Sequence, residues 1–272
     1  MKNSDFLVMD FIKNDTALHE TRSLHDLTGK VAYVTGGGGG IGSAIAWGFA
    51  CFGADIVILD HNIEAAQNVA ATISSRTGRK AIPVAVDISE EQSVQSALAI
   101  AEAALGACDV LVNGAGHNIR KPLIDFSLEE FNSLYAVHVQ GAFLACKIIG
   151  AKMQERRGGS IINIASIAGH VGMQNVSAYS SAKGALIQLT KTLALEMAPY
   201  NVRVNAISPG YITTPLTHQH APAVRERVAR ATPMGRLGRP SELIGPALFL
   251  ASKGSSFVTG SSIVVDGGWT TA

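Results

Sequence analysis

Five consecutive glycines interrupt a long uncharged segment near the N-terminus. Residues Val31–Ala54 carry no charged side chain and would be long enough to cross a bilayer, but Gly36–Gly40 occupy their middle. Each glycine costs a helix about 1 kcal/mol relative to alanine, so one continuous helix is excluded. The segment is therefore predicted to form a strand, Val31–Thr35, then a glycine loop, and then a helix, Ile41–Phe52.

The rest of the chain repeats this alternation of short apolar runs and segments of helical periodicity. Further strands are predicted at Asp55–Asp60, Ala81–Val86, Val110–Val112, Ser160–Ala165 and Val202–Ile207. Helices are predicted at Ile63–Ser75, from Ser89 to about Leu105, from Ser127 to about Gly158, and within Ser177–Pro199. Capping-box patterns open the second and third of these helices, at Ser89–Gln92 and Ser127–Glu130. The alternation predicts one doubly wound α/β domain, residues 27–272, whose parallel sheet has helices on both faces, after an N-terminal extension, residues 1–26.

Composition and charge exclude several classes of function. Hydrophobic residues make up 47% of the chain and charged residues 16%, which is unlike a disordered protein. The net charge of +1 gives no field to attract nucleic acid or an anionic membrane. The cysteines at positions 51, 108 and 146 lack metal-ligand spacing and are expected to be buried thiols, with no metal bound. Charged residues interrupt the first 23 residues, so no signal peptide is expected and a cytoplasmic location is predicted.

The glycine loop and the acid after the second strand together indicate a dinucleotide site. Small residues between a strand and a helix allow backbone amides to approach a pyrophosphate at the helix N-terminus. A flexible turn would have the same composition, but Asp60 follows Gly42 at about the spacing expected for a carboxylate that binds the ribose 2′-hydroxyl. Because a carboxylate repels a 2′-phosphate, NAD is favoured over NADP. An ordinary strand-end cap remains the alternative role for Asp60.

A serine, a tyrosine and a lysine provide candidate chemistry. Tyr179 and Lys183 lie four residues apart and share one face of a predicted helix. Ser166 directly follows a predicted strand, at the sheet edge where doubly wound domains bind ligands. The three side chains are thus expected in one cleft with the cofactor. The structural alternative is a strand-end cap at Ser166 and a packed core aromatic at Tyr179.

These motifs, taken in order, resemble the short-chain dehydrogenase/reductase family over about residues 26–272. The resemblance rests on the Thr35–Gly42 loop, Asp87, Asn113–Gly116, Ser166, the Tyr179/Lys183 pair, Pro209–Gly210, and Val264–Gly268, which is similar to the family's last strand. It implies a Rossmann-type sheet of about seven strands. The cofactor-binding residues that it implies are Gly36, Gly40, Ile41, Gly42, Asp60, Asp87, Ile88, Asn113, Gly114, Ala115, Tyr179, Lys183, Pro209, Gly210, Ile212 and Thr214.

The resemblance also implies a mechanism for oxidising a secondary alcohol with NAD. Tyr179 would act as general base in oxidation and as general acid in reduction. Ser166 would hydrogen-bond the substrate oxygen, and Lys183 would lower the pKa of Tyr179 and hold the nicotinamide ribose. Family members are commonly tetramers, and the apolar segment Ala142–Ile149 suggests a further subunit contact.

The sequence departs from the family at His138, where most members carry the fourth catalytic residue, an asparagine. Histidine could relay a proton while titrating near neutral pH, or it could simply fill the space. Gly114 replaces a second asparagine and permits close backbone approach to the cofactor. His117 and Asn118 follow in the same loop, and either could contact substrate or be solvated.

The substrate is expected over residues 167–176 and the loop after Gly210, with Tyr211 among its contacts. Polar residues of that loop would suit a polyhydroxylated ligand; these are Thr213, Thr214, Thr217, His218 and His220. The resemblance therefore favours an NAD-dependent dehydrogenase of a polyol, sugar or sugar acid. A 3-oxoacyl thioester reductase is the alternative, although it would more often use NADPH. A non-enzymatic NAD sensor on the same fold is the remaining possibility.

Overall fold

A computed structural model describes Thr21, residues 23–214 and residues 222–271. Seven strands form one parallel sheet in the order β3-β2-β1-β4-β5-β6-β7. Their bounds are β1 Val31–Thr35, β2 Asp55–Asp60, β3 Ala81–Ala85, β4 Val110–Asn113, β5 Gly159–Ile164, β6 Val202–Pro209 and β7 Ser262–Val265. The order reverses between β1 and β4, which is where a doubly wound sheet opens a ligand crevice. The predicted α/β class, the parallel sheet and the seven strands are confirmed.

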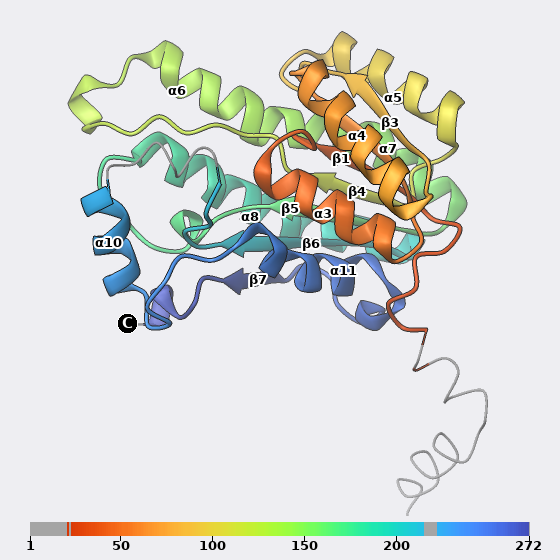
Figure 1. Cartoon of the computed structure of the whole chain (residues 1–272). Coiled ribbons are helices and arrows are strands. Elements are labelled where there is room, and N and C mark those ends of the chain that lie inside the picture. The colour runs from red at the N-terminus through yellow and green to blue at the C-terminus, as the bar shows by residue number, and fades with distance from the viewer. Residues whose placement is uncertain (1–20, 22, 215–221, 272) are drawn as a thin grey trace, which may run out of the picture.

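Helices cover both faces of this sheet (Figure 1). The α-helices of the described chain are α3 Gly40–Cys51, α4 Ile63–Thr77, α5 Glu91–Leu105, α6 Leu128–Tyr135, α7 Ala142–Arg156, α8 Ser177–Met197, α10 Pro222–Ala231 and α11 Ile244–Ala251. Helices α3, α4 and α11 pack on one face, while α5, α7 and α8 pack on the other. The central strands therefore bury both of their faces, which explains why they are apolar without alternation, while the edge strands β3 and β7 stay partly exposed.

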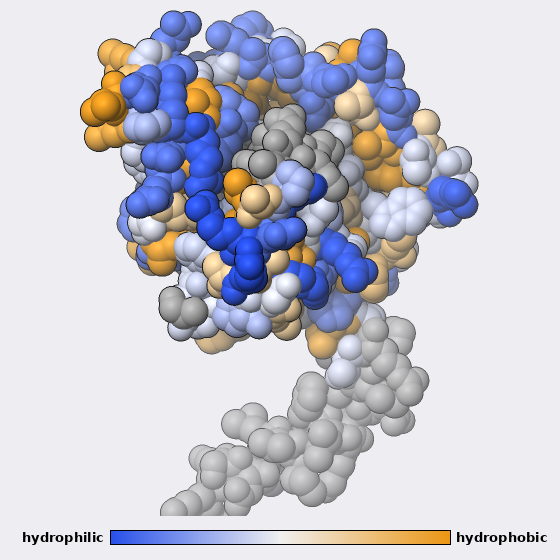
Figure 2. Space-filling view, turned by 60° about the vertical axis from the view of Figure 1, so that its left-hand side comes forward, coloured by the Kyte–Doolittle hydropathy of each residue, from blue (hydrophilic) through white to orange (hydrophobic). Residues whose placement is uncertain are grey.

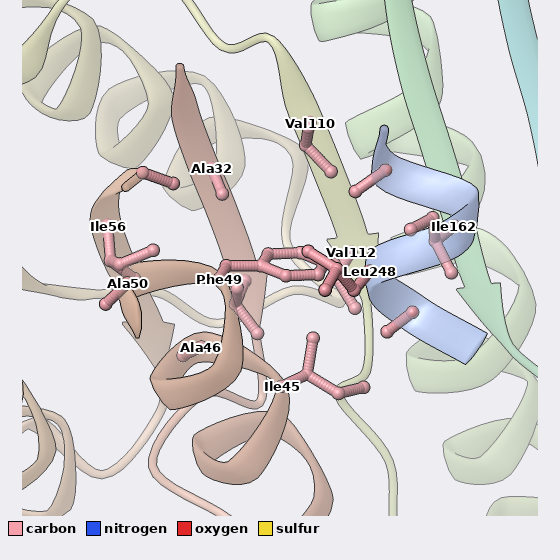
Figure 3. Close-up of a cluster of buried hydrophobic side chains, with 14 of the residues drawn as sticks. Ala32, Ile45, Ala46, Phe49, Ala50, Ile56, Val110, Val112, Ile162 and Leu248 are labelled. Atoms are coloured by element: carbon pink, nitrogen blue, oxygen red, sulfur yellow. The ribbon is translucent and has the colours of Figure 1, made fainter. Parts of the chain in front are cut away.

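Alternate residues of the central strands enter two separate hydrophobic cores. In β1, Val34 points to the core beneath α3, while Tyr33 points to the core beneath α5 and α7. Phe49 of α3 is fully buried and lies at the centre of the first core, where Leu248 of α11 also packs (Figure 3). These two cores hold the strands in place, so the loops at their carboxyl ends are positioned by a rigid scaffold.

The two predicted capping boxes had different outcomes. Ser127 caps α6 and forms the full reciprocal box with Glu130. The box predicted at Ser89 is wrong: the helix begins at Glu91, its N-cap Glu90 makes no side-chain cap bond, and Ser89 Oγ instead donates to Asp87 Oδ1 at 2.6 Å. The helix begins two residues after Ser89, so Ser89 is not its N-cap, and the serine hydroxyl donates a charge-assisted bond to the preceding carboxylate.

The long helix predicted from Ser127 to about Gly158 exists but changes its hydrogen-bond pattern in the middle. Helices α6 and α7 are joined by the π-helical turn η2, Ala136–Gly141. By length and composition Leu128–Arg156 could cross a membrane, but half of its apolar window is buried inside this fold. It therefore resembles the core helix of a globular protein.

The prediction that all three cysteines are buried is wrong for one of them. Cys108 and Cys146 are buried free thiols, but Cys51 is exposed at the last position of α3. The amphipathic turn of α3 directs Phe49 and Ala50 into the core and leaves the next residue on the outside. In the described residues, no group of three or more His, Cys, Asp or Glu side chains could hold a metal ion.

The segment Ala142–Ile149 is more buried within the chain than its composition suggested. Most of its apolar residues belong to the second core, and Phe143 is the large hydrophobic side chain of the segment that remains exposed, at 46%. Hydrophilic residues cover much of the face in Figure 2, with hydrophobic residues in separate groups between them. Phe143 is therefore the large apolar side chain of this segment that could contact another subunit.

Candidate active site

The glycine loop forms a tight cradle between β1 and α3. Gly36 has φ +66°, and a Cβ there would lie 2.7 Å from Ala115 Cα. A Cβ at Gly37 would lie 2.8 Å from the Val34 carbonyl oxygen. Helix α3 begins at Gly40 with no side-chain cap and no acidic residue in its first turn. The first amides of this helix can therefore receive an anion such as a pyrophosphate.

Asp60 ends β2 and its carboxylate is fixed against this loop. Oδ2 accepts a hydrogen bond from the Gly38 amide at 2.9 Å, and Oδ1 accepts one from the Asn62 amide at 2.9 Å. Each carboxylate oxygen keeps a free lone pair for a ribose hydroxyl. The residues of the loop and Asp60 thus fit the adenosine half of a dinucleotide. An ordinary strand-end cap would make the same two bonds, so that alternative for Asp60 stays open; the N-cap of α4 is Asn62.

The end of β5 and the start of α8 bring the serine, tyrosine and lysine together. Ser166 precedes the short helix η3, Ile167–Gly169, and its Oγ accepts a bond from the Ala168 amide at 3.1 Å. The same side chain lies close enough to Tyr179 to lower the pKa of its phenol. Lys183 is 4% exposed, donates from Nζ to the Ile164 carbonyl at 2.6 Å, and lies 5.7 Å from the centre of the Tyr179 ring. Ser166 is therefore both a cap and a partner of the tyrosine.

Burial dominates the proton affinities of this group. It lowers the pKa of Lys183 to about 7, because the ammonium loses its hydration. It also raises the pKa of Tyr179 above its usual value, and the hydrogen bond from Ser166 offsets only part of that rise. That Lys183 lowers the pKa of Tyr179 stays a prediction for the enzyme with its cofactor bound. The tyrosine is held protonated, which is the form that can donate a proton to a ketone oxygen.

A cavity of about 430 Å³ lies over these residues. This volume falls within the range of small-molecule sites. The predicted residues that line it are Ile41, Gly114, His117, His138, Ser166, Tyr179, Lys183, Pro209, Gly210, Tyr211, Ile212 and Thr214. Ile167, Ala168, Met173 and Val176 also line it, as expected for the segment 167–176. The cavity therefore joins the end of the glycine loop to the tyrosine.

Comparison with known proteins identifies the family. A family model described as "Enoyl-(Acyl carrier protein) reductase" matches residues 36–270, which is most of the chain. The chain belongs to the short-chain dehydrogenase/reductase family. Relatives that match over nearly their whole length are named as dehydrogenases or reductases of CH–OH groups, and this chain is an oxidoreductase of that class.

Several named relatives resemble this short-chain dehydrogenase/reductase over nearly their whole length. The 2-dehydro-3-deoxy-D-gluconate 5-dehydrogenase of Formosa agariphila is 36% identical over 90% of this chain and 94% of its own. D-threitol dehydrogenase of Mycolicibacterium smegmatis is 38% identical over 90% of this chain and 94% of its own. The structure of a gluconate 5-dehydrogenase from Burkholderia cenocepacia, in complex with NADP and tartrate, is 37% identical, covers 93% and 99% of the two chains, and has a TM-score of 0.88.

His138 occupies the π-helical turn of this dehydrogenase/reductase and is 3% exposed. Its Nε2 lies 2.7 Å from the His117 carbonyl oxygen, so Nε2 must carry the proton that it donates. Nδ1 is then an acceptor, and it is buried without a hydrogen-bond partner among the described residues. Burial, with the Lys183 charge, lowers the pKa of His138 to about 2. Titration of His138 near neutral pH is therefore not expected.

The other predicted residues lie along the sheet edge outside this cavity. Asp87 follows β3 and accepts from Ser89, and Ile88 is buried nearby. Asn113 is 5% exposed and donates to Asn163 at 2.8 Å, so its side chain joins β4 to β5. Those that do not line the cavity are Gly36, Gly40, Gly42, Asp60, Asp87, Ile88, Asn113 and Ala115. Thr217, His218 and His220 lie outside the described residues, and Thr213 does not line the cavity.

Gly116 and Arg120, which follow β4, also line the cavity; sequence reasoning named Gly116 in a motif without giving it a role, and it missed Arg120. A Cβ at Gly116 would lie 2.8 Å from His138 Nδ1, so this glycine makes room for the imidazole. Arg120 lies three positions after His117, on the loop whose His117 and Asn118 are candidate substrate contacts. Its charge beside a candidate cleft was a signal that could have drawn attention to it.

Proposed function

We propose that this enzyme interconverts a secondary alcohol of a polyol, sugar or sugar acid and the corresponding ketone, with NAD(H) as cofactor. The observation that carries the proposal is the position of Tyr179. Tyr179 lines one cavity together with Ser166, Lys183 and Ile41, the residue that follows the five glycines, and Lys183 Nζ lies 5.7 Å from the centre of its ring. A phenol, a hydroxyl and an ammonium in one cavity are the groups that alcohol oxidation by hydride transfer requires.

The chain's own residues bind the substrate and move its proton. Ser166 hydrogen-bonds the substrate oxygen and stabilises negative charge that develops there. In reduction, protonated Tyr179 donates its hydroxyl proton to that oxygen; in oxidation, the phenolate removes it. Lys183, anchored on the Ile164 carbonyl, supplies positive charge next to the phenol. A bound nicotinamide supplies or accepts the hydride.

Asp60 supports NAD rather than NADP. Its carboxylate is fixed at the glycine loop by the Gly38 amide, where it would repel a 2′-phosphate. A related gluconate 5-dehydrogenase binds NADP, so the preference needs its own test. We expect Asp60→Ala to reduce the ratio of kcat/KM with NAD to that with NADP. An unchanged ratio would refute the role of Asp60.

The named relatives and the cavity support a hydroxylated substrate. Relatives act on a dehydro-deoxy-gluconate and on D-threitol, both of which carry several hydroxyls. Polar groups of His117, Asn118 and Thr214 line the cavity of this enzyme. A 3-oxoacyl thioester reductase remains the second candidate, because a relative named 3-oxoacyl-[acyl-carrier-protein] reductase, from Chlamydia trachomatis, is 38% identical over 89% of this chain.

The deciding experiment measures NADH formation from NAD with a panel of polyols, aldonic acids and simple secondary alcohols. Wild-type enzyme should oxidise a polyol or aldonic acid, and Tyr179→Phe should lose that turnover while still binding NADH. Tyr200→Phe, at an exposed tyrosine outside the cavity, is the matched control and should retain activity. Turnover by Tyr179→Phe would refute the proposed mechanism. Tight NADH binding with no turnover in either direction would favour the sensor.

Two further parts of the proposal concern the protein as a whole. A homotetramer is proposed from the family resemblance, and exposed Phe143 on α7 is a candidate contact residue. A monomer mass in light scattering at micromolar concentration would contradict it. The cytoplasmic location and the division of the chain at residue 26 stay predictions from the sequence.

A further inference from the structure

Arg120 is a cation in the wall of the active-site cavity. It lies on the loop after β4 and lines the cavity with Asn118 and His117. Its guanidinium donates to the Gln174 carbonyl at 3.4 Å, across the loop that precedes Tyr179. Arg120 makes no ion pair with any described residue, whereas the neighbouring Lys121 pairs with Glu130 at 2.5 Å. An arginine left without a carboxylate in a cavity wall is a binding group for an anion.

The charges around the cavity have one sign. Among its described lining residues, Arg120 and Lys183 are basic and none is acidic. Burial lowers the pKa values of His117 and His138, so both rings are neutral at pH 7. Lys183 is 4% exposed and its ammonium is bound to a backbone carbonyl. Arg120 is therefore the group that can give a second, remote part of the substrate a charge partner.

A chain of contacts connects Arg120 to the reacting group. His138 packs edge-on against the Tyr179 ring, with 5.3 Å between the ring centres, and its Nε2 donates to the His117 carbonyl. Arg120 follows His117 by three residues, which span at most about 11 Å even when fully extended. The segment is held on its other side by the Lys121 amide, which donates to the Asn175 carbonyl at 2.9 Å.

Asn118 adds an unused polar group on the same wall. Its side-chain oxygen is buried and has no hydrogen-bond partner among the described residues. Buried polar atoms are nearly always paired, so an unpaired one in a cavity wall indicates a ligand group that is bound there. A hydroxyl of the substrate would satisfy it.

We propose that Arg120 binds the carboxylate of a hydroxylated acid whose alcohol carbon lies at Tyr179, and that Asn118 accepts a hydrogen bond from another hydroxyl of that acid. This assignment rests on the proposed dehydrogenase function and selects sugar acids over neutral polyols. Because Arg120 contacts a group remote from the reacting carbon, its loss should raise KM more than it lowers kcat.

The test compares gluconate with sorbitol, which carry a carboxylate and a CH2OH group on the same six-carbon hydroxylated skeleton. Arg120→Gln should lower kcat/KM for gluconate about 10- to 140-fold, the factor for losing a charge-assisted hydrogen bond, and should change the value for sorbitol less than about twofold. Arg120→Lys should give a kcat/KM for gluconate between those of the wild type and Arg120→Gln. Asn118→Ala should lower kcat/KM for both substrates by a similar factor. Arg76→Gln, at an exposed position of α4, should change kcat/KM for neither substrate.

Direct binding separates this proposal from the proposed function. Calorimetric titration of gluconate into the enzyme–NADH complex should show binding that Arg120→Gln abolishes and that weakens with added salt. If Arg120→Gln lowers kcat/KM equally for gluconate and sorbitol, or if the wild type prefers sorbitol, the carboxylate assignment is overturned. The proposed dehydrogenase function would stand in either case. Arg120-dependent binding without any turnover would overturn the dehydrogenase and leave the anion site standing.

Discussion

Gly116 is the position where the smallest substitution should have a large effect. A Cβ there would lie 2.8 Å from His138 Nδ1 and 3.3 Å from Nε2, and closer still to Cε1. The imidazole cannot withdraw easily, because it is 3% exposed and packs edge-on against Tyr179. Gly116 does not adopt a left-handed φ, so Gly116→Ala introduces steric conflict with the ring but no backbone strain.

The expected cost of Gly116→Ala follows from two contributions. Displacing His138 breaks its bond to the His117 carbonyl, which is worth about 1 kcal/mol. Overpacking a closely filled site costs about 1–3 kcal/mol more. The free energy of unfolding should therefore fall by about 2–4 kcal/mol, seen as a lower urea midpoint with an unchanged m-value. Gly158→Ala is the matched control, because nothing lies within 4 Å of a Cβ at Gly158, and its stability should stay close to that of the wild type.

A double-mutant cycle identifies the side chain responsible. In a His138→Ala background the Cβ at position 116 meets empty space, so Gly116→Ala should then cost less than about 0.5 kcal/mol. If Gly116→Ala costs as much in that background as in the wild type, the conflict with His138 is not the cause. The reasoning about this pair would then be wrong.

Three further predictions concern buried polar groups. The Lys183 pKa is about 7 in the folded chain and about 10.4 when unfolded, so the unfolded state binds more protons between those values and stability should rise with pH across this window. Lys183→Met should remove most of that rise, measured by urea unfolding at pH 6.5 and 9.5; a rise of the same size in the variant would contradict the assignment. Asn163→Ala should lower the free energy of unfolding by about 2–4 kcal/mol, because the Asn113 amide loses the Asn163 oxygen as its acceptor. Asn68→Ala, at an exposed position, should leave the free energy of unfolding almost unchanged. His138→Asn should leave the shape of the pH–rate profile unchanged between pH 6 and 8, since His138 stays neutral there; loss of an ionisation in the variant would show that His138 titrates.

The fold was predictable because its strands are short, apolar and separated by helices. The strand Asp55–Asp60 and the start of the helix at Ile63 were placed to the residue. The exact start of a helix was harder to foresee, as at Ser89, where the helix begins only at Glu91 and the serine hydroxyl donates to Asp87. The exposed Cys51 depends on where the last turn of α3 leaves the core, which composition does not indicate.

The site was predictable where local motifs fix geometry and not where distant segments meet. Tyr179 and Lys183 share a helix face, so their spacing alone places them together. Arg120 lines the cavity because its loop is tied to the segment before Tyr179 through the Gln174 carbonyl. That contact joins residues far apart in the sequence, so no pattern of residue spacing predicts it.

At position 138, the surroundings of the substituted side chain determine its protonation and therefore its chemical role. A histidine is suited to proton relay when it is partly solvated, because its pKa then lies near neutral pH. Here the π-helical turn buries the ring, the His117 carbonyl fixes the proton on Nε2, and Gly116 leaves space for the rest of the imidazole. The same features that accept the larger side chain also keep it neutral, so Nδ1 faces its surroundings as a permanent acceptor. An asparagine oxygen is likewise an acceptor that does not titrate, and His138 therefore preserves the chemical character of the family's residue while changing its size.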